Sequence, residues 1–245
     1  KLDLLGLTAL TTVNKCLNII KDTRNIELDL AKVPDDDSKT FDIICAGNTS
    51  GLFQFDQGSG IAELCIKLQP RSIEDLAVIN ALFRPGPLSS GMADSYAKRK
   101  NNIEPVTYIT PELKPILENT QGLMVYQEQA MRIAMDLAGY TLQEADTLRK
   151  AIGEKLPEEM EKHQQKMVSG MVEHGVTKEA AAKIFEEIRW FADYSFNKAH
   201  AVAYSTLTYR TAYLKTHYPL EFYCALLTLH GDERDSLTRY LADCR

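Results

Sequence analysis

The sequence predicts a mainly α protein with a short β segment at its N-terminus. Apolar residues recur at helical spacing along most of the chain, and residues that start or stop helices flank those repeats. The first seven residues are the exception: they include the leucines Leu2, Leu4 and Leu5 close together, and Gly6 interrupts them. At 245 residues the chain is long enough for one large domain or two small ones with a buried core.

Composition excludes several classes of protein. Hydrophobic residues make up 44% and charged residues 25%, as in soluble globular proteins, and no apolar run approaches the roughly 18 residues of a membrane span. No charged-then-apolar leader opens the chain, so we expect neither a membrane nor a secreted protein. The net charge of −6 argues against a small DNA-coating protein, but not against a polymer-binding enzyme with basic residues on one face.

The cysteines predict a reducing compartment. There are five, widely scattered and without a CxxC pair, which argues against a disulfide framework and against structural zinc. We expect packing residues in a cytoplasmic protein: Cys16, Cys45, Cys65, Cys224 and Cys244.

The first third of the chain alternates between short elements and loops. Residues 1–7 predict a strand ended by Gly6, and the next helix is expected from apolar residues at Leu10, Val13, Leu17 and Ile20. Asp36 or Asp37 is expected to cap a helix that carries Phe41 and Ile44. Residues 73–82 predict another helix, ended by Pro85.

Beyond Gly122 the pattern is almost entirely helical. Thr141 and Glu144 form a capping box, followed by one apolar face made by Leu142, Ala145, Leu148 and Ile152. Pro157 suits the first turn of the next helix, and a longer helix is expected over residues 199–217.

Signals for common catalytic sites are missing. Three consecutive aspartates, Asp35 to Asp37, cannot all face one ion on regular structure, and the five histidines have no HxxH or HExxH spacing. The chain also lacks the phosphate-binding motif GxxxxGK[ST] and a GxGxxG that opens a helix.

Cations at helix starts and tight turns are the clearest functional signal. Arg84 stands before a rigid proline turn that leads to Ser89 and Gly91, and Arg149 and Lys150 are adjacent on one helix. At the start of the long helix Asn197 suits a cap, and Lys198 and His200 follow it where free backbone amides favour an anion. Together these groups would grip a triphosphate, whereas each alone is also explained as a solvated surface cation. Spacing does not show that they converge.

Tyrosines gather on the same helix. Stacking on bases is one interpretation, but core packing is favoured for most of them, because Tyr209 and Tyr213 lie one turn apart.

Four motifs carry a family resemblance. They are ALFRPGP at residues 81–87, VYQEQ at 125–129, AGYTL at 138–142 and FNKAH at 196–200. With KLDLLGL at residues 1–7, they closely resemble, in the same order, the C-family of replicative DNA polymerases, the alpha subunits of bacterial DNA polymerase III. The resemblance covers nearly the whole chain.

The resemblance implies a place within a polymerase. Residues 1–8 would be the C-terminal edge of the palm domain and residues 9–245 a multi-helix fingers domain, incomplete at its C-terminal end. Asp3 would be a catalytic, metal-binding carboxylate for Mg²⁺. The nucleotide-facing residues would be Arg84, Ser89, Gly91, Arg149, Lys150, Asn197, Lys198 and His200.

The implied activity is addition of deoxynucleotides from deoxynucleoside triphosphates to a primer 3′ end on template DNA, in bacterial chromosome replication. The sliding clamp, clamp loader and proofreading exonuclease subunits would be partners of the parent protein. The chain begins at Lys1 and looks like a piece of a longer protein. It lacks the family's other two palm aspartates, so we expect the isolated chain to be inactive.

Departures and alternatives stay open. This chain has Arg149-Lys150 where the family usually shows two arginines, and Glu154 where it often shows lysine. Residues 53–60 are richer in glycine than the family pattern. An error-prone, damage-tolerant paralogue and a non-catalytic helical module that binds nucleic acid remain as alternative functions.

Overall fold

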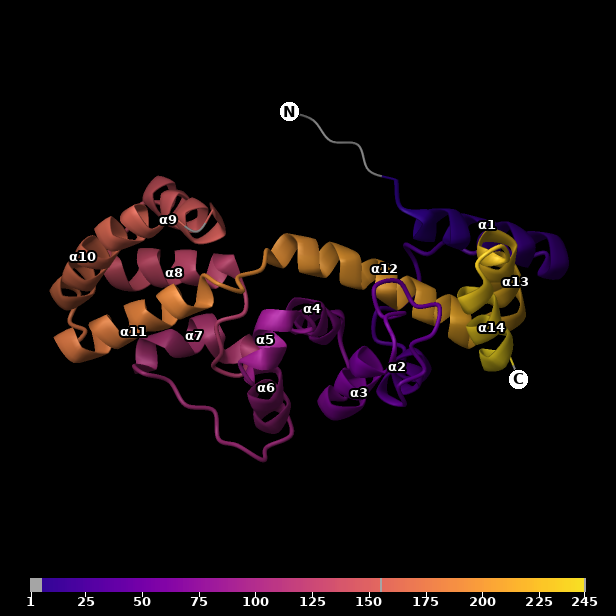
Figure 1. Cartoon of the computed structure of the whole chain (residues 1–245), viewed down its shortest axis with the longest axis horizontal. Helices are drawn as coiled ribbons and strands as arrows, with labels where there is room; N and C mark the ends of the chain where they lie inside the picture. Colours follow the sequence, from indigo (N-terminus) through magenta and orange to yellow (C-terminus); the bar gives the residue numbers. More distant parts are fainter. Residues whose placement is uncertain (1–5, 155, 245) are drawn as a thin grey trace. The chain divides into compact units, whose positions relative to one another are not determined.

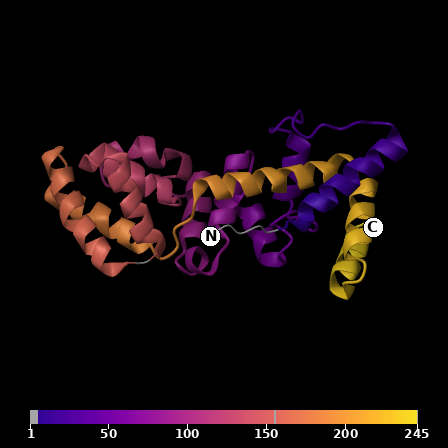
Figure 2. The same ribbon diagram turned by 90° about the horizontal axis from the view of Figure 1, so that it is seen from above.

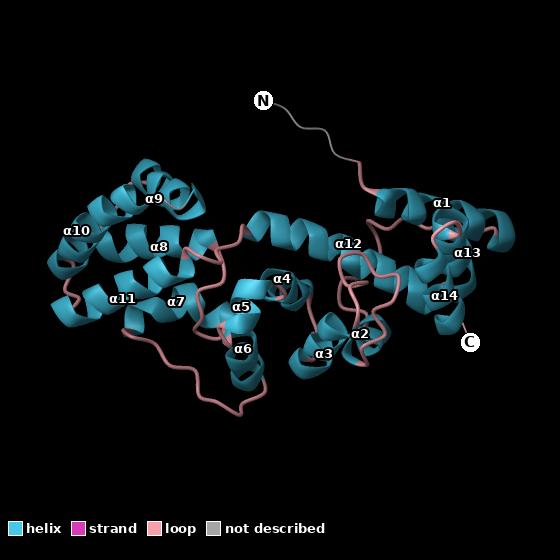
Figure 3. Cartoon of the chain, viewed as in Figure 1, coloured by secondary structure: helices cyan, strands magenta, loops and turns pink. Residues whose placement is uncertain are grey.

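The computed structural model describes residues 6–154 and 156–244, and within these ranges its regular structure is entirely helical (Figures 1 and 3). The chain divides into two compact units, residues 1–77 with 202–245 and residues 78–201. The divisions fall inside α4 (Ile73–Leu82) and α12 (Lys198–His217). The predicted mainly α class is confirmed, and α4 matches its predicted bounds.

The first unit joins the two ends of the described chain. Beside parts of α4 and α12 it contains α1 (Thr8–Arg24), α2 (Ser38–Cys45), α3 (Ser59–Leu68), α13 (Pro219–His230) and α14 (Arg234–Asp243). Helix α1 packs on α13, and both views show them side by side (Figures 1 and 2). Arg24 ties the pair together, because its Nε and Nη2 donate to the two carboxylate oxygens of Glu221 at 2.6 and 3.0 Å.

A cap and a buried lysine order the loops of this unit. Asp37 caps α2 as predicted: its Oδ2 accepts hydrogen bonds from the Thr40 amide at 2.9 Å and from His217 Nε2 at 2.9 Å. Lys215 Nζ is nearly inaccessible and donates to the carbonyls of Asn48 and Ser50 and to Asp243. All three donors of that ammonium are therefore used.

The second unit is built around a helical core. Its helices are α5 (Pro85–Ser89), α6 (Met92–Lys100), α7 (Lys114–Leu117), α8 (Gln127–Ala138), α9 (Leu142–Glu154), α10 (Pro157–Glu173) and α11 (Lys178–Phe191), with 3₁₀ turns at Pro111–Leu113 and Glu118–Thr120. Helices α8 to α11 enclose a continuous apolar cluster that includes Ile133, Leu148, Met167 and Phe185. Gly139 ends α8 at φ 70°, where a Cβ would come within 2.8 Å of His174 Cε1.

The capping box of α9 is confirmed, but its predicted apolar face is one residue too long. Glu144 Oε2 accepts from the Thr141 amide at 2.9 Å, and the Glu144 amide donates to Thr141 Oγ1. Leu148 and Ile152 are fully buried, whereas Leu142 is 68% exposed. As the first residue of α9, Leu142 precedes the turn that packs on α8.

The predicted N-terminal β segment is not seen. Lys1–Leu5 lie outside the described residues, and Gly6 and Leu7 lead into α1 without belonging to a strand. A strand needs a neighbour for its backbone hydrogen bonds, and in the described ranges the only β pairing is an isolated bridge between Tyr126 and Phe196.

Two further expectations are tested within the described ranges. No helix there has both the length and the apolar character to cross a membrane. None of the five cysteines forms a disulfide; Cys16, Cys45 and Cys65 are buried as expected of packing residues, whereas Cys224 and Cys244 are exposed. Burial raises the pKa of Cys16 and Cys65 to about 12, so both remain thiols at neutral pH.

The contrast between two leucines of α9 tests the packing of the second unit. Leu148→Ala leaves a cavity in the core and is expected to lower the free energy of unfolding by about 2–5 kcal/mol. Leu142→Ala, the same substitution on the same helix, is expected to change it by less than about 0.5 kcal/mol. Urea unfolding measures both, and equal losses would contradict the assigned face of α9.

The Asp37 cap makes a pH-dependent contribution to stability. Burial alone would raise the pKa of Asp37, but hydrogen bonds from Thr40 and His217 outweigh it and hold the pKa below its usual value. The carboxylate therefore stabilises the fold above its unfolded pKa of about 3.9, and this contribution is lost as the pH falls through the lowered folded value.

We expect Asp37→Ala to cost about 1 kcal/mol at pH 7, with the gap to the parent chain closing below about pH 4. Asp35→Ala, at an exposed neighbouring carboxylate, is the control and should change stability by less than about 0.5 kcal/mol. A gap for Asp37→Ala that stays constant with pH in urea unfolding would show that the charge of the cap is unimportant.

Candidate nucleotide-binding site

Arg84 is built into the second unit by its backbone and its side chain. It is the N-cap residue of α5, with Pro85 fixing the first turn. Arg84 Nε donates to the Ala81 carbonyl at 3.1 Å, Nη2 donates to the Tyr194 carbonyl, and the guanidinium carbon lies 4.5 Å from the centre of the Phe196 ring. The side chain therefore fastens the segment between α11 and α12 to the proline turn.

The close approach at this turn requires glycine. A Cβ on Gly86 would come within 2.7 Å of Tyr194 Cδ1. Burial lowers the pKa of Arg84, yet an arginine remains charged in proteins. With Nε and one N–H of Nη2 used, three of its five N–H donors remain for another group.

The start of α8 holds the same segment from a second side. The Gln127 amide donates to the Phe196 carbonyl at 2.9 Å, and Gln127 Nε2 donates to Ser195 Oγ at 3.1 Å. Gln129 points into the core instead, where its Oε1 accepts from the amides of Val125 and Tyr126. The VYQEQ motif thus joins residues 195–198 to the core of the second unit.

Asn197 caps α12 as predicted, but the anion-binding amide behind it is already used. Asn197 Oδ1 accepts from the His200 amide at 2.8 Å. The expected free amide of Lys198 donates to Glu128 Oε2 at 3.0 Å, and Asn197 Nδ2 donates to Glu128 Oε1 at 2.9 Å. The expectation is corrected because an internal carboxylate satisfies the helix start.

The side chains of Lys198 and His200 are exposed at this helix start. Lys198 Nζ lies 5.9 Å from the centre of the Tyr126 ring and has no ion-pair partner among the described residues. The His200 ring meets the Phe196 ring edge-on at 5.5 Å. Arg84 and His200 contact the same Phe196 ring, so the structure brings these two predicted residues together at the segment that leads into α12.

The contacts that the structure gives for the side chains of Arg149 and Lys150 are with their own helix, and not with the start of α12. Both pair with Asp146 one turn earlier on α9, at 2.8 and 3.0 Å. The hydrogen bond from Lys150, and then that from Arg149, holds the pKa of Asp146 below its usual value. Further along α9, a Cβ on Gly153 would lie 3.4 Å from Gln127 Nε2, so the end of α9 approaches the start of α8.

Ser89 and Gly91 lie after the proline turn. Ser89 Oγ donates to the Gly86 carbonyl, and Gly91 takes φ 76° at the start of α6 with open space around its Cα. The amides expected to be exposed here are used: Gly91 donates to the Leu88 carbonyl and Met92 to Ser90 Oγ. Both hydrogen bonds are long, at 3.3 and 3.4 Å. The amides of Gly91 and Met92 would therefore bind an anion only if they gave up these two bonds.

The described residues do not build a metal site. Within the described ranges no group of three or more His, Cys, Asp or Glu side chains is placed to hold an ion. Asp37 is occupied as a cap, in agreement with the sequence analysis. Asp3, the predicted metal-binding carboxylate, lies outside the described residues.

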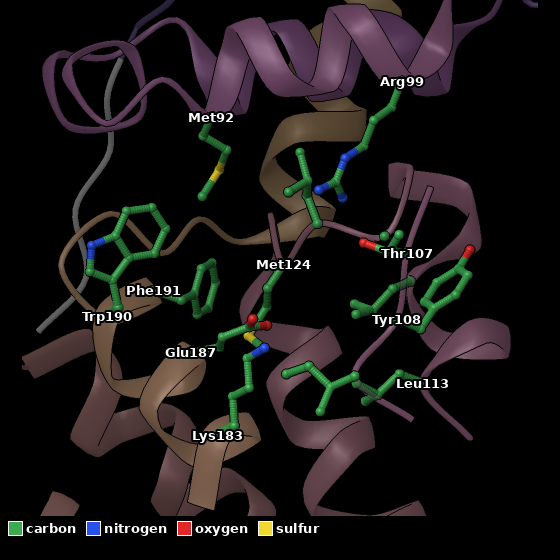
Figure 4. Close-up of a pocket in the computed structure, with 14 residues that line it drawn as sticks. Met92, Arg99, Thr107, Tyr108, Leu113, Met124, Lys183, Glu187, Trp190 and Phe191 are labelled. Atoms are coloured by element: carbon green, nitrogen blue, oxygen red, sulfur yellow. The ribbon is translucent and has the colours of Figure 1, made fainter. Parts of the chain in front are cut away.

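A separate hollow of about 510 Å³ lies between α6, α11 and the loop around Tyr108 (Figure 4). Partial burial raises the pKa of Glu187 there, opposed by the charges of Lys183 and Arg99. Arg99 is itself paired with Glu104 at 3.0 Å. The charges of the hollow therefore nearly cancel, which does not suit a polyphosphate, and none of the predicted nucleotide-facing residues lines it.

The residue missed by the sequence analysis is Glu128. It lies 69 residues from Asn197, and no periodicity links the two positions. In the sequence, only its position inside the VYQEQ motif at residues 125–129 pointed to Glu128 as a residue of interest.

Comparison with known proteins agrees with the motifs. The family model described as the bacterial DNA polymerase III alpha subunit finger domain matches residues 9–175. The chain is similar to DNA polymerase III subunit alpha of Thermus aquaticus, 44% identical over 250 residues that cover 100% of this chain and 20% of that protein. It is 43% identical to the Escherichia coli (strain K12) subunit over 253 residues, 100% of this chain and 22% of that protein.

The corresponding protein of Aquifex aeolicus (strain VF5) is 44% identical over 237 residues, 97% of this chain and 20% of that protein. The chain thus spans about a fifth of the length of the curated relatives that it matches. The resemblance inferred from the motifs is confirmed: the chain belongs to the family of the bacterial DNA polymerase III alpha subunit finger domain.

Proposed function

We propose that this chain binds the incoming deoxynucleoside triphosphate in a DNA-directed DNA polymerase that extends a primer during bacterial replication. The relatives are named DNA polymerase III subunit alpha. The observation that carries the proposal is the exposed ammonium of Lys198, which has no ion-pair partner among the described residues, at a helix start that Arg84 and α8 hold in place. A cation carried by a backbone that is held in place suits a polyphosphate.

The residues are assigned different roles according to how exposed they are and what they contact. Lys198 and His200 supply exposed side chains, and Arg84 supplies its remaining N–H donors from the half-buried side. Arg149 and Lys150 pair with Asp146 on α9, and a more highly charged anion would compete with that carboxylate for them. Asn197 caps the helix that carries Lys198 and His200, and Ser89 and Gly91 belong to the turn that follows Arg84 in the chain.

Positioning is the main requirement of this chemistry. Phosphoryl transfer needs the reacting groups in line and the charge of the triphosphate offset, with little covalent work by the protein. A cation whose backbone is already fixed at a helix start meets part of that requirement, because only its side chain has to be ordered on binding. The template, sliding clamp, clamp loader and exonuclease subunits would contact the parent protein, and Mg²⁺ would be held by Asp3 and carboxylates beyond this chain.

Lys198→Ala in the full-length polymerase tests the proposed contact. Loss of one ammonium–phosphate hydrogen bond of about 1.5–3 kcal/mol should raise the KM for the deoxynucleotide about tenfold or more. The dissociation constant for primer–template DNA should change by less than about twofold. Steady-state extension and a DNA-binding titration measure the two quantities.

Lys178→Ala is the matched control, since Lys178 is the exposed first residue of α11 as Lys198 is of α12. It should leave both constants unchanged. If Lys198→Ala instead weakens duplex binding in a strongly salt-dependent way, Lys198 contacts the DNA backbone and the assignment is wrong.

Asp3→Asn tests the proposed metal role in the full-length enzyme. A neutral amide cannot replace a carboxylate ligand of Mg²⁺, so nucleotide addition should nearly disappear while primer–template binding is retained. Activity within a few fold of the parent enzyme, measured with saturating Mg²⁺, would remove Asp3 from the site.

A further inference from the structure

We propose that Glu128 is a positioning residue for nucleotide binding: its carboxylate holds the first turn of α12 so that Lys198 and His200 face the triphosphate. This inference rests on the proposed function of that helix start. Glu128 was not among the residues that the sequence analysis selected.

The carboxylate connects two helix starts. Glu128 lies in the first turn of α8, where negative charge is favoured, and its two oxygens accept from Asn197 Nδ2 and the Lys198 amide at 2.9 and 3.0 Å. Its backbone cannot shift easily, because Gln127 on one side bonds to Phe196 and Gln129 on the other is buried in the core.

Only a group with two acceptor oxygens satisfies this arrangement. The His200 amide is a donor, so the Asn197 oxygen must face it, and the Asn197 NH₂ group must then face Glu128. The Lys198 amide is a second donor. A glutamine at 128 would offer one oxygen and one NH₂ group, and one of the two hydrogen bonds would be lost.

Glu128 also leaves the charge of Lys198 available. It binds the backbone amide of Lys198, whereas Nζ lies near the Tyr126 ring without an ion-pair partner in the described part of the chain. The carboxylate therefore directs the lysine without neutralising it. That separation of roles distinguishes Glu128 from Asp146, which pairs with the side chains of Arg149 and Lys150.

Exchanging donor and acceptor between positions 128 and 197 tests the inference in the full-length polymerase. Glu128→Gln breaks one hydrogen bond, and Asn197→Asp keeps the helix cap but sets two carboxylates against each other. Each single variant should raise the KM for the deoxynucleotide about three- to tenfold, with kcat and primer–template binding within about twofold.

The double variant should restore the KM to within about twofold of the parent enzyme, because the new amide donates to the new carboxylate and still accepts from the Lys198 amide. A role in folding alone would not produce a rescued KM among variants whose melting temperatures are equal. Glu112→Gln, which removes an exposed carboxylate from the same unit, is the control and should change nothing.

An unchanged or lower KM for Glu128→Gln overturns the inference, as does a double variant no better than the single ones. If Lys198→Ala raises the KM while Glu128→Gln does not, only the inference about Glu128 fails. If Lys198→Ala leaves the KM unchanged, the proposed nucleotide contact fails and the inference falls with it.

Discussion

The candidate site depends on how the segment between α11 and α12 satisfies its backbone hydrogen bonds. Residues 194–197 belong to no helix, and their polar groups are taken up by Arg84 from one side and by the start of α8 from the other. A polar backbone group that is buried without a partner costs about 1–3 kcal/mol, more than a typical hydrogen bond contributes on balance. The same contacts that avoid this cost place Lys198 and His200 at the start of α12.

Charge balance explains why these cations are tolerated in a folded chain. Asp146 pairs with both basic residues of α9, and Glu128 offsets the positive helix start beside Lys198. The two carboxylates would respond differently to a bound triphosphate. Asp146 pairs with cationic side chains, so a more highly charged anion would compete with it. Glu128 binds a backbone amide and a side-chain amide, so it would stay in place.

Local patterns predicted most helices, since caps and apolar spacing act within a few residues of each other. The Asp37 cap, the Thr141–Glu144 box and the bounds of α4 all follow from such local chemistry. Helix α3 was not predicted, because glycines such as Gly58 and Gly60 usually mark loops; in the structure Gly58 lies outside the helix at φ 87° and only Gly60 is within it.

Contacts between distant segments were beyond the reach of the sequence pattern. Glu128 and Asn197 meet across 69 residues, and the hydrogen bond from Arg84 to Tyr194 spans 110. The family motifs marked these positions without showing which residues would touch. Arg84 was predicted as a phosphate contact, and the structure adds that it fastens the site's backbone.

A structure of the full-length polymerase with primer–template DNA, deoxynucleotide and Mg²⁺ is the decisive test of the proposed contact between Lys198 and the triphosphate. The quantity to measure is the distance from Lys198 Nζ to the nearest triphosphate oxygen. We expect an ion pair, within about 4 Å, with Glu128 still bound to the Lys198 amide. A lysine directed at the DNA backbone, or more than about 10 Å from the triphosphate, would contradict it.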